Sequence, residues 1–205
     1  MIAATVISAG TSSRMGYPKA LLEFHGRTFL ETILDTMRAV GVQRRVVVLG
    51  PDADKILKHI DLRDTTVVST ERLDAGPIGS IRAAIREVQA HPVDGLLVWP
   101  VDMPQVTIAT VETLLERFLT SDRVIAVPEF DGTRGHPVIF GRATFQELLD
   151  APDSEGARSV VRADSGRVVT VSVPDRGVVE DHNTPSEYRR LITRHDAARE
   201  RGSST

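Results

Sequence analysis

Short apolar runs rich in β-branched residues alternate with helical patterns along most of this 205-residue chain. Uninterrupted runs of this kind suit strands that are covered on both faces, as in a mainly parallel sheet. Their alternation with helices is typical of α/β proteins. We therefore predict an α/β fold around a mainly parallel sheet, with strands at residues 2–7, 45–49, 66–68, 96–99, 124–127, 138–140 and 168–173.

The segments between these runs carry apolar residues at a spacing near 3.6, which predicts helices. Thr28 and Thr107 are plausible N-caps, and Gly41 is a plausible residue just beyond a helix end. Residues 129–137 are polar and rich in turn formers, so we expect a loop there. We expect one domain over residues 1–192 and a frayed tail over 193–205. The predicted helices lie at residues 29–40, 78–88, 108–118, 156–163 and from 185 onward.

Composition excludes several classes of function. The chain has 25 Lys and Arg against 28 Asp and Glu, and 4% aromatic residues, so neither a basic field nor stacking platforms favour nucleic acid as a partner. It has no cysteine, which excludes disulfides and thiolate metal sites. No apolar run approaches the roughly 20 residues of a membrane span, and the start has no signal-peptide pattern. We therefore expect a cytoplasmic protein with no membrane partner.

The first predicted strand runs into a loop, residues 8–19, that has the chemistry of a phosphate site. Glycine lets main-chain N–H groups approach anionic oxygens, small hydroxyl residues leave room, and cations neutralise charge. Neither GxxxxGK[ST] nor GxGxxG is present, which argues against an ordinary ATPase or dinucleotide dehydrogenase. The alternative is a tight strand-to-helix connection with two solvated cations. We predict that a triphosphate binds here, with Arg14 and Lys19 as catalytic cations and nucleotide contacts from Ser8, Ala9, Gly10, Thr11, Ser12 and Ser13.

Asp102 follows a very apolar strand and lies between Pro100 and Pro104, which would hold its carboxylate rigidly. In open α/β sheets ligands bind beyond the carboxyl ends of the strands, so Asp102 and the Gly10 loop can share one crevice if their strands are neighbours. A carboxylate beside a triphosphate is typical of Mg²⁺ binding. A turn or a helix cap is the alternative for Asp102.

Three further segments carry candidate site residues. The turn holding Gly76, Gly79 and Ser80 has little bulk and exposes backbone groups suited to a nucleobase, although ordinary helix capping explains it too. Asp181 and Asn183 precede Thr184-Pro185, which is an ordinary helix start, and either can also complete the metal shell. His136 lies between Gly135 and Pro137 and is a candidate acceptor contact, with a structural hydrogen bond as the alternative.

Taken in order, these segments resemble the nucleotidyltransferases that act on the molybdenum cofactor, and in particular their cytidylyltransferase branch. The resemblance implies a Rossmann-like, three-layer nucleotidyltransferase fold, a nucleoside triphosphate with Mg²⁺, and a phosphate-bearing acceptor such as molybdopterin. It also implies a molybdoenzyme, or the chaperone of one, as a possible recipient. The matching motifs are Ile7-Ser8-Ala9-Gly10, Arg14-Met15-Gly16, Lys19-Ala20-Leu21-Leu22, Gly79-Ser80-Ile81, Asp102-Met103-Pro104, Gly135-His136-Pro137-Val138, Gly156-Ala157-Arg158 and Asn183-Thr184-Pro185.

The choice of nucleobase is the finer question. Asn183 stands where cytidylyltransferases commonly carry aspartate, a feature shared with the guanylyltransferase branch. Ala9 stands where that branch typically has glycine, whose smaller size leaves more space for a purine, so we favour CTP over GTP. Two alternatives remain: transfer to a sugar or polyol phosphate, and nonenzymatic binding or delivery of nucleotide or cofactor. An oxidoreductase is the least favoured because no GxGxxG follows the first strand.

Overall fold

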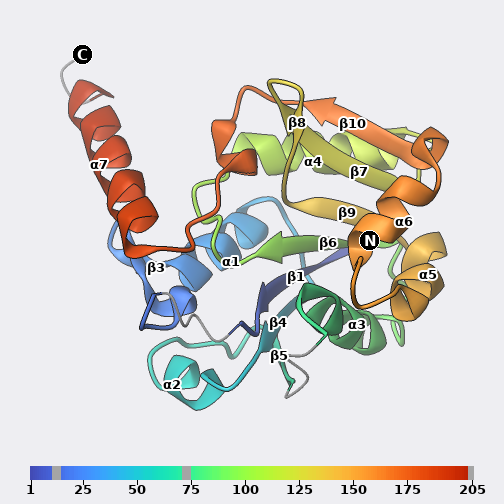
Figure 1. The fold of residues 1–205 in the computed structure, drawn as a ribbon, viewed down its shortest axis with the longest axis horizontal. Helices are drawn as coiled ribbons and strands as arrows, with labels where there is room; N and C mark the ends of the chain where they lie inside the picture. Colours follow the sequence, from blue (N-terminus) through green and yellow to red (C-terminus); the bar gives the residue numbers. More distant parts are fainter. Residues whose placement is uncertain (11–14, 71–74, 203–205) are drawn as a thin grey trace.

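A computed structural model describes residues 1–10, 15–70 and 75–202, with side chains as far as His195. Its centre is an eight-stranded sheet in the order β10-β7-β9-β6-β1-β4-β5, with β8 beside β7 (Figure 1). Six of these strands are parallel to one another, whereas β8 and β9 run antiparallel to them. The strands are β1 (Ile2–Ser8), β4 (Arg45–Leu49), β5 (Thr66–Ser69), β6 (Gly95–Pro100), β7 (Ile125–Phe130), β8 (Thr133–Arg134), β9 (Val138–Gly141) and β10 (Val168–Ser172), with a separate hairpin of β2 (Glu23–Phe24) and β3 (Arg27–Thr28).

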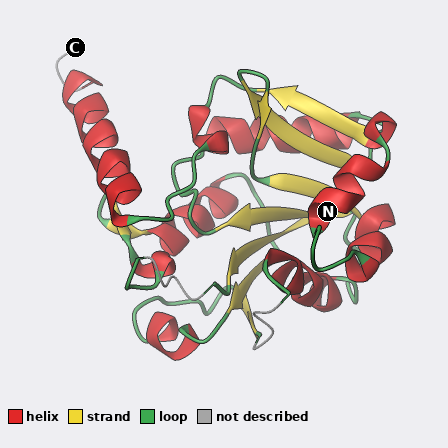
Figure 2. Ribbon diagram, viewed as in Figure 1, coloured by secondary structure: helices red, strands yellow, loops and turns green. Residues whose placement is uncertain are grey.

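Helices cover both faces of the sheet, which gives three layers (Figure 2). One face packs against α1 and α4, and the other against α3, α5 and α6. The last helix, α7, lies to the side, next to α1 and the β2-β3 hairpin (Figure 1). The strands supply both cores because successive side chains point to opposite faces. In β6, for example, Leu97 and Trp99 face the first core while Leu96 and Val98 face the second. The helices are α1 (Phe29–Ala39), α2 (Ala53–Leu57), α3 (Pro77–Val88), α4 (Ile108–Thr120), α5 (Phe145–Asp150), α6 (Ala157–Ala163) and α7 (Pro185–Gly202).

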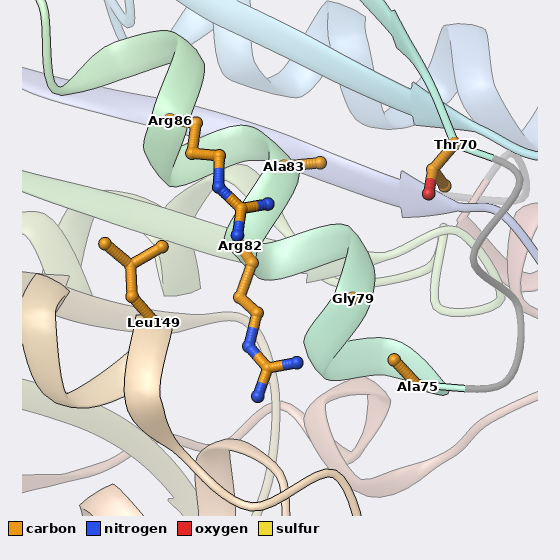
Figure 3. A pocket seen from close by; sticks show the side chains of 7 residues that line it. All are labelled: Thr70, Ala75, Gly79, Arg82, Ala83, Arg86 and Leu149. Atoms are coloured by element: carbon orange, nitrogen blue, oxygen red, sulfur yellow. The ribbon is translucent and has the colours of Figure 1, made fainter.

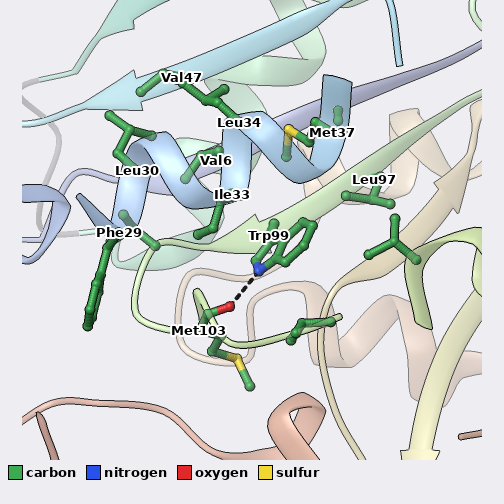
Figure 4. Close-up of a cluster of buried hydrophobic side chains, with 14 of the residues drawn as sticks. Val6, Phe29, Leu30, Ile33, Leu34, Met37, Val47, Leu97, Trp99 and Met103 are labelled. Atoms are coloured by element: carbon green, nitrogen blue, oxygen red, sulfur yellow. Dashed lines mark hydrogen bonds between the residues drawn. The ribbon is translucent and has the colours of Figure 1, made fainter. Parts of the chain in front are cut away.

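The first core is built around α1 and ends beneath the loop that carries Asp102 (Figure 4). Trp99 is fully buried, and its indole N–H donates to the carbonyl of Met103 at 2.9 Å. A buried indole N–H needs such an acceptor, so the bond fixes the direction in which the chain leaves β6. A strongly apolar strand therefore also anchors a candidate site loop.

The predicted boundaries agree with the structure over the sheet and the main helices. Thr28 caps α1 through a reciprocal capping box with Glu31, and the Thr107 hydroxyl accepts from the N–H of Thr110 at the start of α4. Gly41 has φ +77°, as expected of a residue just past a helix end. The mainly parallel α/β sheet predicted from the alternating pattern is confirmed.

The segment at residues 129–137 differs from the expectation. Residues 129–137 are not a plain loop, because β7 continues to Phe130 and turns through Asp131 and Gly132 into β8. Both turn residues have positive φ, the geometry of a two-residue hairpin. Four further elements, β2, β3, α2 and α5, are short and carry no pattern that predicted them.

The last helix, α7, spans Pro185–Gly202. The frayed tail expected over residues 193–205 stays a prediction. The first half of α7 is attached to the body: the Tyr188 hydroxyl donates to the carbonyl of Glu23, Leu191 is buried, and the His195 ring lies 4.9 Å from that of Phe24. In the described part of the chain, no helix combines the length and hydrophobicity that a membrane span requires.

Candidate active site

Two predicted site segments leave neighbouring strands at the same edge of the sheet. Strands β1 and β6 are parallel neighbours, with Ile7 opposite Pro100. The N–H of Val101 donates to the carbonyl of Ile7 at 3.2 Å, so the pairing continues past the end of β6. The segment Ser8–Gly10 and the loop at Asp102 therefore start side by side. This edge is where ligands bind in open α/β sheets.

Lys19 joins three parts of the chain that are far apart in sequence. Its Nζ lies 2.7 Å from Oδ2 of Asp102 and 2.5 Å from Oδ1 of Asn183. The lysine side chain is 14% exposed and that of Asp102 is 18% exposed, so the pair is largely removed from water but still reachable. A cation held by one carboxylate and one neutral amide leaves the cluster without excess negative charge, which suits a polyanionic ligand.

The segment Asp181–Asn183 lies against the Asp102 loop. The N–H of His182 donates to the carbonyl of Asp102 at 3.1 Å. One carboxylate oxygen of Glu187 accepts from the N–H groups of both Asn183 and Thr184 at 2.8 Å, and the Thr184 hydroxyl accepts from the N–H of Glu187. Thr184 therefore caps α7 as the structural interpretation expected, while the Asn183 side chain still contacts Lys19. The roles predicted for Asp181 and Asn183 as metal ligands stay predictions.

His136 lies within electrostatic range of the same cluster. Its main-chain N–H donates to the carbonyl of Val178 at 2.8 Å, a bond that does not depend on the imidazole, so both roles considered for this side chain stay predictions. Burial lowers the pKa of its imidazole; Asp102 raises it, Arg158 lowers it, and Asp181 raises it. Nδ1 is buried without a hydrogen-bond partner among the described residues. The ring is thus neutral near pH 7 and close enough to these charges to be influenced by all three.

The predicted nucleobase turn begins α3 further along the same edge. Gly76 is the N-cap with φ +60° and ψ −152°, a conformation open essentially only to glycine. Thr70, Ala75 and Gly79 line one end of a pocket of about 290 Å³ (Figure 3). Arg82 and Arg86 line it along α3, together with Ala83 and Leu149. Ser80 does not line this pocket and is buried, with 4% of its surface exposed.

The structure places some predicted residues and leaves others undescribed. Ser8 is half-buried and Ala9 buried at the end of β1, whereas Gly10 is exposed. Thr11, Ser12, Ser13 and Arg14 lie outside the described residues, so their predicted roles stay predictions. Among the side chains described, those of residues 1–10, 15–70 and 75–195, no group of three or more from His, Cys, Asp or Glu is arranged to hold a metal ion. A metal here would need oxygens from the nucleotide as well.

Three residues that support this site were not predicted as site residues. Gln105 and His182 form a buried pair behind Asp102, joined by a 3.2 Å contact between Oε1 and Nε2. Gly50 follows β4, and a Cβ there would lie 2.2 Å from the carbonyl oxygen of Ala9. The glycine after an apolar strand was a readable signal for such close approach. No local signal pairs Gln105 with His182, since 77 positions separate them.

Comparison with known proteins agrees with this arrangement. A family model described as "MobA-like NTP transferase domain" matches residues 4–168. The chain is 27% identical to the nicotine blue oxidoreductase of Paenarthrobacter nicotinovorans, with 93% of this chain and 96% of the relative covered. It is 30% identical to the molybdenum cofactor guanylyltransferase of Xanthomonas euvesicatoria pv. vesicatoria (strain 85-10), covering 91% of this chain and 92% of the relative.

Solved structures give the same result. Crystalline Rv0371c from Mycobacterium tuberculosis H37Rv superposes with a TM-score of 0.83 at 30% identity, covering 94% of this chain and 97% of that one. Its complex with manganese superposes with a TM-score of 0.77 at 29% identity, covering 94% and 98%. The fold is therefore that of the Rossmann-like nucleotidyltransferases, and the protein is an enzyme of that class. The chain belongs to the MobA-like NTP transferase family, which confirms the resemblance found in its motifs.

Proposed function

We propose that this enzyme transfers a nucleoside monophosphate from a nucleoside triphosphate to a phosphate-bearing acceptor and releases pyrophosphate. One observation carries the proposal: Lys19 meets Asp102 and Asn183 at the strand edge from which the glycine loop departs. A cation between two oxygen-bearing side chains at that edge suits phosphate chemistry more than any other reaction we considered.

The proposed reaction is direct. A terminal phosphate oxygen of the acceptor attacks the α-phosphorus of the triphosphate, a new phosphoanhydride bond forms, and pyrophosphate leaves. The enzyme has to hold two anions together that otherwise repel each other. Lys19, with Arg14 as the second predicted cation, neutralises the charge that develops on the phosphate oxygens. No covalent enzyme intermediate is needed.

The residues at this edge fit a divalent cation. Asp102 and Asn183 already direct oxygens at one cation, the Lys19 ammonium group, and these are the ligand atoms that Mg²⁺ prefers. Mg²⁺ usually takes one or two protein carboxylates and completes its shell with phosphate oxygens and water. We propose Asp102, with Asp181 and Asn183, as the residues that hold it. When bound, the metal supplies positive charge to the phosphate groups.

We propose CTP as the preferred nucleotide and GTP as the alternative. Ala9 supports CTP because its side chain takes space that glycine would leave to a purine, and it is buried beside the close approach of Gly50. GTP is supported by the relative named molybdenum cofactor guanylyltransferase. Ala9→Gly should therefore raise the ratio of GTP to CTP turnover by about tenfold, the effect of roughly one methyl group in a tight pocket. A ratio that stays the same would remove Ala9 from base selection.

We propose molybdopterin as the acceptor, by analogy with the same relative, and a molybdoenzyme or its chaperone as the recipient of the product. His136 is the candidate acceptor contact because it lies within electrostatic range of the cluster with a buried, neutral ring. The experiment measures pyrophosphate release from CTP, GTP and ATP, each with molybdopterin and with a set of sugar phosphates. Release only with a sugar phosphate would replace the proposed acceptor. No release from any combination would contradict the proposed transfer reaction.

A further inference from the structure

Gln105 and His182 are two buried polar side chains that the proposed reaction does not use directly. They are 7% and 5% exposed. The Gln105 amide nitrogen donates to the carbonyl of Gly177 at 2.9 Å and to that of Glu180 at 2.7 Å. Both of its N–H groups are thus used, and its oxygen is left as an acceptor. It faces Nε2 of His182 at 3.2 Å, so His182 carries its proton on Nε2.

This pair connects the two segments that supply the candidate metal oxygens. Gln105 lies three positions after Asp102, and His182 lies between Asp181 and Asn183. His182 is bonded twice to the Asp102 loop, through its main-chain N–H to the carbonyl of Asp102 and through its ring to Gln105. The same two segments are also joined through Lys19, because Oδ2 of Asp102 and Oδ1 of Asn183 both contact the Lys19 nitrogen.

A structural role alone does not explain why this position is polar. The His182 ring packs near Phe29, with 6.5 Å between ring centroids, in surroundings where an apolar side chain would also be buried. Its Nδ1 is buried without a hydrogen-bond partner among the described residues. Burying such an atom costs free energy, so packing favours an apolar residue here. The bond to Gln105 is what the histidine adds.

We propose that Gln105 and His182 are positioning residues that set the separation of the Asp102 and Asn183 side chains and so the affinity for the divalent cation. This inference rests on the proposed function. Partners outside the first ligand shell commonly change metal affinity by about 10- to 100-fold when removed. Here the bond from Gln105 holds residue 182, and residue 182 holds its two neighbours against the Asp102 loop.

The test is a titration of the full-length protein with Mn²⁺ alone, followed by electron paramagnetic resonance of the free ion, with thermal unfolding of each variant. His182→Met and His182→Gln have similar length, but only the glutamine offers a donor to Gln105. We expect His182→Met to bind Mn²⁺ about tenfold more weakly or worse and His182→Gln to stay close to the wild type. His182→Phe keeps a ring beside Phe29 and gives a second variant without the donor.

Thr144→Val is the matched control. Thr144 is fully buried, and its hydroxyl donates to the carbonyl of Gly141 at 2.8 Å in a part of the fold away from the cluster. It should lower the melting temperature without changing Mn²⁺ affinity. Equal weakening in Thr144→Val, or equal weakening in His182→Gln and His182→Met, would overturn the inference. So would wild-type affinity in both variants that lack the donor, or no Mn²⁺ binding by the wild type.

The two proposals fail in different ways. A wild-type protein that binds Mn²⁺ but transfers no nucleotide contradicts the proposed function and leaves the comparison of His182 variants valid. A wild-type protein that transfers nucleotide while His182→Met binds Mn²⁺ normally contradicts only the role of the Gln105 and His182 pair.

Discussion

The two ends of the candidate site are built differently. At the end of β6, three hydrogen bonds hold the Asp102 loop. The Trp99 indole donates to the carbonyl of Met103, the N–H of His182 donates to the carbonyl of Asp102, and the Lys19 ammonium group donates to the Asp102 carboxylate. At α3, the predicted nucleobase turn depends on the conformation of Gly76, and a Cβ there would meet no atom of the described residues within 4 Å. One end is held by many bonds and the other is left with room.

The difference fits the roles proposed for the two ends. Charge stabilisation is steep in distance, so groups that act on phosphates gain most from being held in place before the reaction. Recognition of a nucleobase depends on available volume and on a few backbone groups, which a turn with little bulk provides. Substitutions at the β6 end should therefore impair turnover, and those at the α3 end should alter nucleotide binding and stability.

The largest effect is expected for Asp102→Asn, which removes the only carboxylate that contacts Lys19 in the described part of the chain. We expect Mg²⁺-dependent triphosphate binding to be abolished and the melting temperature to change little. Calorimetric titration with and without Mg²⁺ measures this. Asp122→Asn, at a side chain that is 88% exposed, is the control. Unchanged metal dependence would show that another carboxylate holds the cation.

The second largest effect is expected for Lys19→Ala, which removes the cation at the β6 end of the candidate site. It should lower the rate by about a hundredfold or more, the usual loss on removing one charge-stabilising group. The melting temperature should be nearly unchanged. Lys58→Ala, at an exposed lysine on the surface, controls for the loss of charge. Steady-state pyrophosphate release gives the rate, and equal activity in Lys19→Ala would refute the catalytic role.

Gly76→Ala probes the open end. Because φ +60° with ψ −152° strains any residue with a Cβ, it should cost about 1–3 kcal/mol of unfolding free energy. It should also raise KM for the nucleotide more than it changes kcat. Gly156 has the same conformation at the start of α6, so Gly156→Ala is a matched control that should lose stability alone. An equal rise in KM in both variants would contradict a role for the Gly76 turn in binding the nucleobase.

The smallest effect concerns pH. Burial lowers the pKa of His195 from its ordinary value near 6.5, the charges of His25 and Arg194 lower it further, and Asp175 and Glu180 oppose them. The unfolded state then binds more protons below about pH 6.5, so the stability from neutral His195 is present above that pH and lost as pH falls. His195→Phe should reduce the drop in melting temperature between pH 7.5 and 5.5. An unchanged drop would assign it to His136 and His182, whose pKa values burial also lowers.

Much of the fold could be predicted because its signals are local. The strands are continuous apolar runs, and Thr28, Thr107 and Gly41 mark helix ends by their own chemistry. Short elements such as α2 and α5 were missed because five or six residues give too little periodicity. The β7 and β8 hairpin was missed because Asp131-Gly132 was interpreted as loop composition, although this pair is a strong hairpin signal.

In the candidate site too, residues in local motifs could be predicted, and long-range pairs could not. Lys19, Asp102 and Asn183 were named as site residues from their motifs, and the structure brings them into contact. Their separate roles stay predictions. The pairing of Gln105 with His182 could not be predicted, because each looks like an ordinary polar residue until the topology places residue 105 beside residue 182. Sequence patterns indicate which residues do chemistry more readily than which residues hold them.

The contacts of Lys19 affect when the candidate site can form during translation. They span 83 and 164 positions, and the second reaches beyond residue 168, where the family match ends. A nascent chain that ends before residue 183 can already form most of the central sheet. It lacks Asn183, whose side-chain oxygen contacts the ammonium group of Lys19. The proposed metal site would therefore be complete only after Asn183 has been added, when the strands of the central sheet can already have paired.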